Sequence, residues 1–197
     1  MAHSSVVNHR RRALEAELKL IVAGTEHVPA LRELIDVSVR ALSRDYYTPQ
    51  QIESALCYVF GVDTQLLADR TYYVIEDEDR VVAAGGWSHR RTLFGGDQHK
   101  SAEDPELDAS CEPARIRAFF VHPAWARRGL ARRLFGECVT AARAHGFTAL
   151  ELGATLPGRP LYLALGFAPV ESLEVRMPDG VQLPVIRMRH VLEPGQK

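Results

Sequence analysis

The sequence has few cysteines, no long hydrophobic run and almost no net charge, and each shortage excludes a class of protein. Cys57, Cys111 and Cys138 are the only cysteines among 197 residues, too few and too scattered for a disulfide framework or a zinc site. No apolar run approaches the ~20 residues of a membrane span, and the N-terminus lacks a signal-peptide core. The net charge of −1 gives no basic field for nucleic acid. We expect a cytoplasmic, metal-free protein that binds neither membrane nor nucleic acid.

The length suits one folded domain, and the hydrophobic content of 46% is that of an ordered chain. We assign residues 18–192 to this domain, residues 1–17 to a flexible N-terminal tail and residues 193–197 to a C-terminal tail. The first tail carries a basic cluster, His9–Arg12, which we interpret as solvated rather than as a nucleic-acid or lipid-headgroup patch. Residues 95–113 are polar, acidic and rich in turn residues, which predicts a long loop that is either mobile or shapes a site.

Hydrophobic periodicity and turn signals predict the element order β, α, α, β, β, loop, β, α, β, α, β, β. Thr25 is expected to cap the first helix, and Thr48-Pro49-Gln50-Gln51 has the pattern of a capping box that opens the second. Later helices are expected at 130–145 and 161–165. The expected strands are 18–23, 71–75, 81–88, 115–121, 148–152, 173–177 and 181–190. This order predicts a mixed α/β domain.

The segment Phe119–Phe135 (FFVHPAWARRGLARRLF) contains the most informative chemistry. A buried strand runs into a turn at Arg127-Arg128-Gly129-Leu130-Ala131, where a helix starts at once. The N–H groups of a first helical turn lack partners and bind phosphate, and Gly129 and Ala131 are small enough for close approach. The segment therefore predicts an anion site.

Charge in this region supports the same interpretation. Seven arginines and one acid, Glu137, lie between Arg115 and Arg143, which points to a phosphorylated ligand. The alternative is an amphipathic helix with an arginine-rich solvent face. The spacing fits neither the P-loop of nucleotide hydrolases nor a dinucleotide-binding turn.

With a second motif further along, this segment resembles the GCN5-related N-acetyltransferase (GNAT) family. The family's coenzyme A signature is Gln/Arg-x-x-Gly-x-Gly/Ala at the start of a helix, and Gly129-Leu130-Ala131 matches its Gly-x-Gly/Ala part. Its short helix with Tyr four residues before Gly-Phe is matched by Tyr162 and Gly166-Phe167. Two positions differ from the pattern: Ala126 stands where the signature has Gln or Arg, and Thr155 where many members have Asn.

The resemblance implies the GNAT fold, a central mixed, largely antiparallel sheet of about seven strands flanked by about four helices. Strands 115–121 and 148–152 would splay apart to form the coenzyme A cleft. It also implies an enzyme that uses acetyl-CoA as co-substrate and acetylates a primary amine, on a small molecule or a peptide, by direct attack in a ternary complex. The alternative is a non-catalytic acyl-CoA sensor on the same fold. The final hairpin offers a strand edge through which two copies would pair as a homodimer.

The resemblance also implies roles for particular residues. The backbone of Phe119 and Val121 would bind the pantetheine arm and polarise the acetyl carbonyl, and Thr155 would stand beside that arm. The residues expected to hold the pyrophosphate are Arg127, Arg128, Gly129, Leu130, Ala131 and Arg132.

For catalysis, Tyr162 is expected to protonate the departing thiolate, because a phenol holds its proton at neutral pH. Glu151 is a candidate base, although it is equally able to pair with an arginine such as Arg117 or to face solvent. His89, Asp45 and Glu53 are weaker candidates for the base. Tyr46 and Trp87 would provide aromatic walls for the acceptor, with core packing as the alternative.

Overall fold

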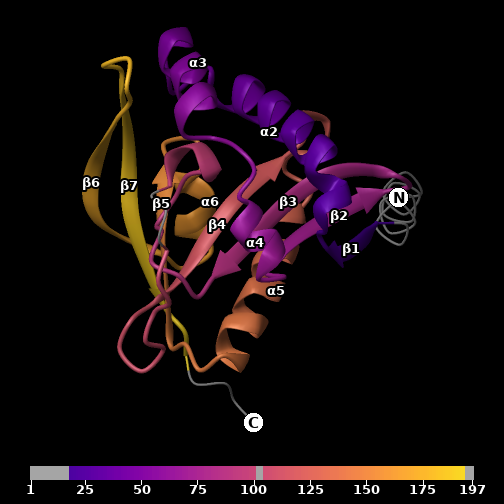
Figure 1. Cartoon of the computed structure of the whole chain (residues 1–197), viewed down its shortest axis with the longest axis vertical. Coiled ribbons are helices and arrows are strands. Elements are labelled where there is room, and N and C mark those ends of the chain that lie inside the picture. The colour runs from indigo at the N-terminus through magenta and orange to yellow at the C-terminus, as the bar shows by residue number, and fades with distance from the viewer. Residues whose placement is uncertain (1–17, 101–103, 194–197) are drawn as a thin grey trace, which may run out of the picture.

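The structure is a computed structural model, and it describes residues 18–100 and 104–193 (Figure 1). The sequence-predicted tail 1–17, with its His9–Arg12 cluster, lies outside these residues, as do residues 101–103 and 194–197. In the described residues, five α-helices pack around a sheet of seven strands. The helices are α2 (Val28–Ser43), α3 (Pro49–Tyr58), α4 (Thr64–Ala68), α5 (Leu130–Ala144) and α6 (Arg159–Ala164).

The strands follow the order β1-β2-β3-β4-β5-β7-β6, and only β4 and β5 run parallel. This confirms the expected mixed, largely antiparallel sheet. The long β6–β7 hairpin forms one side of the molecule (Figure 1). The strands are β1 (Lys19–Val22), β2 (Tyr72–Asp77), β3 (Arg80–Ser88), β4 (Ala114–Val121), β5 (Ala149–Thr155), β6 (Ala168–Arg176) and β7 (Gln182–Val191).

The observed helix starts can be compared with the predicted helix caps. The capping box of α3 is confirmed, because the Gln51 N–H donates to Thr48 Oγ1 at 3.2 Å and the Thr48 N–H donates to Gln51 Oε1 at 3.0 Å. The expected cap at Thr25 is wrong: Thr25 starts a short 3-10 turn, η1 (Thr25–His27), and α2 begins after His27 without a side-chain cap. The sequence reading also missed α4, which Asp63 caps through the N–H groups of its first turn.

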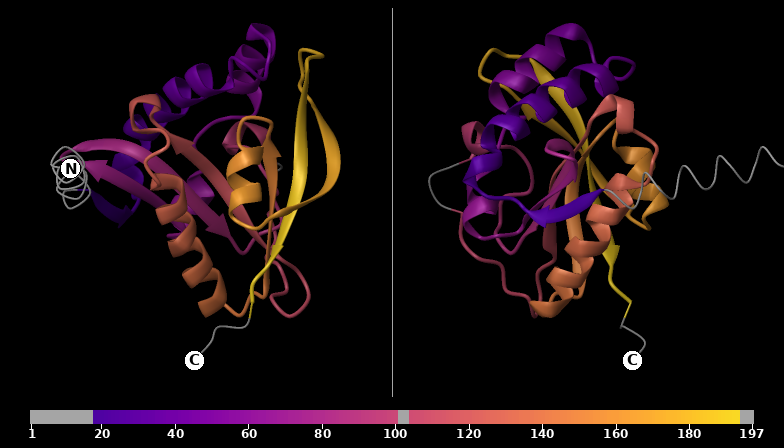
Figure 2. Two further views of the ribbon diagram at one scale, coloured as in Figure 1. Left: turned by 180° about the vertical axis from the view of Figure 1, so that it is seen from behind. Right: turned by 90° about the vertical axis from the view of Figure 1, so that its right-hand side faces the viewer.

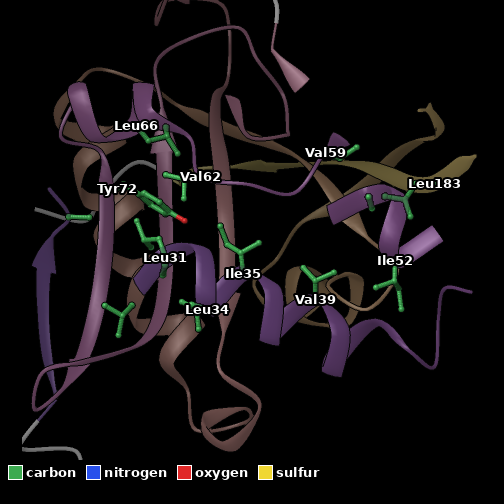
Figure 3. Close-up of a cluster of buried hydrophobic side chains, with 14 of the residues drawn as sticks. Leu31, Leu34, Ile35, Val39, Ile52, Val59, Val62, Leu66, Tyr72 and Leu183 are labelled. Atoms are coloured by element: carbon green, nitrogen blue, oxygen red, sulfur yellow. The ribbon is translucent and has the colours of Figure 1, made fainter. Parts of the chain in front are cut away.

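Helices cover both faces of the sheet, α2 and α3 on one face and α5 on the other (Figure 2). The first face carries the larger buried cluster, in which Leu31 of α2 lies beside Tyr72 of β2 (Figure 3). Behind the sheet, α5 packs on β3 and β4 and buries Cys138 and Ala142. The buried residues Leu31, Leu34, Ile35 and Val39 of α2 recur at helical spacing, as expected for a helix that packs one face on a sheet.

The two parallel strands separate soon after they meet. β4 and β5 pair only through Ala114↔Leu150 and Arg115↔Glu151. Beyond these pairs, β5 follows β7, while β4 follows β3 through a bulge at which Ala118 takes a positive φ of 54°. A Cβ on Gly85 of β3 would come within 2.8 Å of the Phe119 ring, so the glycine makes room for that ring. The splayed strands that the resemblance implied are confirmed.

Hydrogen bonds hold the described part of the long β3–β4 connection against the domain. Arg90 binds Asp69 through two contacts of 2.7 and 2.9 Å, and the Thr92 N–H donates to Asp104 Oδ1 at 2.7 Å. Gly95 and Gly96, at the start of the segment predicted to be a long loop, line the cleft described below. No helix in residues 18–100 or 104–193 is both long and apolar enough to cross a bilayer.

Candidate functional site

A cleft of about 760 Å³ opens where β4 and β5 separate. Its middle is the second half of β4, from Ile116 to Val121. One end is formed by the start of α5 together with α6, and the other by the end of α2, Tyr46, residues 59–61 and the loop 93–96. We call these the α5 end and the loop end. The cleft therefore joins two regions of different chemistry.

At the α5 end, the backbone turns sharply and exposes amides. Arg127 and Gly129 have φ values of 63° and 85°, a left-handed conformation that only glycine adopts without strain. Gly129 caps α5 without a side-chain bond, and no described residue accepts from the N–H groups of Leu130, Ala131 or Arg132. All four residues from Gly129 to Arg132 line the cleft. Free amides and the helix dipole suit an anion there.

The four arginines between residues 127 and 133 lie in different surroundings. Arg127 and Arg132 line the cleft, whereas the Arg128 guanidinium lies 4.6 Å from the centre of the Trp125 ring and does not line it. Arg133 donates to the Leu18 carbonyl at 3.1 Å, behind the sheet. Of the predicted pyrophosphate residues, the structure thus brings all but Arg128 to the cleft.

Phe119 and Val121, the two predicted backbone contacts, lie in the middle of the cleft. The Val121 N–H points across it and donates to the buried hydroxyl of Ser38 on α2 at 3.3 Å. Sequence reasoning missed Ser38; the available signal was a serine on the apolar face of a helix.

Tyr162 lines the cleft from α6 and packs edge-on against Phe119, with ring centroids 6.4 Å apart. Burial raises the pKa of Tyr162 above its ordinary value, so its hydroxyl stays protonated at neutral pH and can donate. Thr155 lines the cleft at the end of β5, where its Oγ1 accepts from the Gly158 N–H at 3.2 Å. Tyr162 and Thr155 therefore both line the cleft, and Tyr162 lies next to Phe119.

Glu151 does not line the cleft. Its carboxylate pairs with Arg115 and lies 3.5 Å from the Arg187 guanidinium. Of the alternatives predicted for Glu151, the structure contains the ion pair, although the partner is Arg115 and not Arg117. This ion pair corrects the predicted base role of Glu151. Of the weaker candidates, His89 lies 3.7 Å from Asp69 and from Glu106, Glu53 pairs with Arg40, and neither they nor Asp45 line the cleft.

The two aromatic residues predicted to line the acceptor site lie in different places. Tyr46 lines the loop end and is 50% exposed. Trp87 is 1% exposed and packs behind the sheet, 4.8 Å from the His145 ring, so its predicted place beside the acceptor is wrong and core packing is its role. Alternation along β3 decides this, because Trp87 lies on the face that α5 covers.

Arg117, which the prediction used only as an alternative partner for Glu151, anchors the loop end. Its guanidinium is buried and donates to Asp63 Oδ2 at 2.8 Å, to the Thr92 carbonyl at 2.8 Å and to the Gly95 carbonyl at 2.6 Å. Lys100 also pairs with Asp63, which is fully buried. Burial lowers the pKa of Arg117 and the Asp63 carboxylate opposes that shift. The signal available in the sequence was an arginine inside an apolar strand.

Comparisons with known proteins agree with this geometry. The profile of the Acetyltransferase (GNAT) family matches residues 33–167. A search of curated proteins found no significant match. Among solved structures, a GCN5-related N-acetyltransferase from Rhodopseudomonas palustris is similar with a TM-score of 0.65 and 17% identity, over 88% of this chain and 95% of that one.

Two other solved structures contain the coenzyme. The PaiA N-acetyltransferase of Thermoplasma acidophilum, in complex with coenzyme A, has a TM-score of 0.59 and 11% identity over 88% of this chain and 98% of that one. YncA of Salmonella typhimurium, with its cofactor acetyl-CoA, has a TM-score of 0.57 and 18% identity over 91% and 96%. At these identities the likeness shows a shared fold.

Proposed function

Because the chain belongs to the Acetyltransferase (GNAT) family, we propose that it transfers an acetyl group from acetyl-CoA to a primary amine. The observation that carries the proposal is the row of unpaired amides at the start of α5, open to the cleft between β4 and β5. Two structures of similar fold contain coenzyme A or acetyl-CoA, which supports this choice of donor.

In the proposed complex, the diphosphate of the coenzyme binds the amides from Gly129 to Arg132. The side chains of Arg127 and Arg132, which line the cleft, add positive charge. Ala126 lines the same wall with no side-chain donor, so the backbone has to supply most of the hydrogen bonds. The pantetheine arm then extends along β4 between Thr155 and the bulge.

The transfer needs no covalent intermediate on the enzyme. The amine nitrogen attacks the thioester carbon, the C–S bond breaks, and Tyr162 gives its proton to the sulfur. The Phe119 and Val121 amides stabilise the charge that develops on the carbonyl oxygen, for which Ser38 has to release Val121. None of the described acids lines the cleft, so the amine loses its proton to water.

The alternative is a sensor that binds acyl-CoA and transfers nothing. Ala126 favours it, because the signature position for a phosphate-binding side chain carries only a methyl group. Binding of the coenzyme is common to both functions, so only turnover separates them.

The test combines calorimetry with a thioester-cleavage assay. Titration of coenzyme A into the protein should release heat, and free thiol should appear from acetyl-CoA only when an amine is added. Binding without thiol release over a broad amine panel would identify the sensor. Thiol release without any amine would identify a hydrolase, and the absence of binding heat would overturn the proposal.

A further inference from the structure

The loop end of the cleft is built from apolar side chains. Leu42 and Val39 of α2 and Tyr46 form one wall, and Phe60 and Phe94 lie opposite along the β4 strand. Besides Tyr46 and Arg117, the polar side chains at this end are those of Ser38 and Ser43, which are neutral hydroxyls. A ligand that binds at this end therefore moves from water into mainly apolar surroundings.

Few charged side chains line the cleft, and all of them are cationic. The charged side chains that line it, among the residues that the structure describes, are Arg117, Arg127 and Arg132. Arg127 and Arg132 belong to the α5 end. Arg117 is occupied, because its guanidinium pairs with Asp63 and two backbone carbonyls. The described residues of the loop end thus offer neither a carboxylate for a cation nor a free cation for an anion.

The loop wall is fixed by close packing. A Cβ on Gly153 of β5 would come within 2.6 Å of the Phe94 ring, so the ring lies directly on that strand. The Gly96 N–H donates to the Val59 carbonyl at 2.8 Å, and Arg117 holds the Gly95 carbonyl. These contacts on three sides make the Phe94 wall part of the folded domain.

We infer that the acceptor is a primary amine with an uncharged, apolar body, such as an alkylamine or an arylalkylamine. The inference rests on the proposed function, because it takes the loop end as the acceptor site. A second ammonium placed there would lose its hydration without gaining a carboxylate, and burial of an unpaired charge is strongly unfavourable. Polyamines and lysine-like amines are therefore excluded, and apolar amines are favoured by the area they bury.

The test compares two amines of equal chain length. Hexylamine and 1,5-diaminopentane differ only in whether the far end carries a methyl or an ammonium group. We expect kcat/KM for hexylamine to exceed that for the diamine by at least about tenfold, and phenethylamine to be a substrate as well. Equal or better turnover of the diamine would overturn the inference. If the enzyme acetylates no amine at all, the proposed function fails instead.

A variant tests where the acceptor binds. Leu42 is 38% exposed on the cleft wall, so Leu42→Glu adds a carboxylate without disturbing the core. It should shift the kcat/KM ratio toward the diamine by at least about tenfold and leave coenzyme A affinity unchanged. Val170→Glu is the matched control, because Val170 is 48% exposed on β6 and lies outside this cleft; its ratio should not move. An unchanged ratio in Leu42→Glu would show that the acceptor does not bind at the loop end.

Discussion

The two ends of the cleft are assembled in different ways. At the α5 end, the amides of the anion site belong to one continuous segment, Phe119–Arg132, in which strand, turn and helix start follow each other, and α6 closes that end. The loop end brings together α2, residues 59–61, residues 93–96 and β4, which are far apart in the sequence. An anion site of backbone amides can be encoded locally, whereas an apolar wall requires tertiary packing. The comparison predicts that substitutions at one end should affect one ligand and spare the other.

The largest effect is expected from Arg117→Met. This change leaves the fully buried Asp63 with Lys100 as its remaining ion-pair partner, and breaking a buried pair costs about 3–5 kcal/mol. Urea unfolding should show that loss, and the KM for the amine should rise while coenzyme A affinity is retained. Arg40→Met, which removes an exposed pair with Glu53, should leave the unfolding free energy nearly unchanged. An Arg117→Met protein as stable as the wild type would contradict the anchoring role.

Tyr162→Phe should have the next largest effect. Loss of a proton donor to the thiolate should lower kcat by about 100-fold, while coenzyme A affinity changes little because the ring still packs against Phe119. Steady-state kinetics and calorimetry measure the two quantities. Tyr58→Phe, on α3 outside the cleft, is the control. An unchanged kcat would remove Tyr162 from the mechanism.

Gly129→Ala tests the turn at the α5 end. The positive φ of 85° makes any side chain there strained, by about 1–2 kcal/mol, and a Cβ would point into open space beside the unpaired amides. Coenzyme A should bind about tenfold more weakly, which is about 1.4 kcal/mol. Gly136→Ala lies within the same helix, where its Cβ also meets nothing, and should leave affinity unchanged. Equal coenzyme A affinities for the two variants would contradict the assignment of these amides to the diphosphate site.

The smallest effect separates two neighbouring arginines. Arg132 lines the cleft and Arg128 stacks on Trp125. Arg132→Ala should therefore weaken coenzyme A binding by roughly 0.5–1 kcal/mol, with a smaller salt dependence than the wild type. Arg128→Ala should change affinity less than Arg132→Ala. The reverse order in calorimetry would show that the bound coenzyme draws Arg128 away from Trp125.

Sequence reasoning predicted the local features well. The helix start at Gly129, the capping box of α3 and Tyr162 before Gly166-Phe167 each depend on residues within one or two turns of each other. Predictions that depended on where a strand side chain would lie succeeded less often. Glu151 pairs with Arg115, and Trp87 enters the core, because the neighbouring strand or helix decides which side of the sheet is buried.

The sequence by itself determined the order of elements apart from α4, the turn that exposes amides at the start of α5 and the family to which the chain belongs, because these depend on short-range spacing and backbone conformation. Tertiary structure decided the rest. The separation of β4 from β5, the burial of Asp63 against Arg117 and the placing of Phe94 on Gly153 arise only when distant segments meet. Packing of side chains against each other, which no local pattern encodes, therefore sets the chemistry of the loop end.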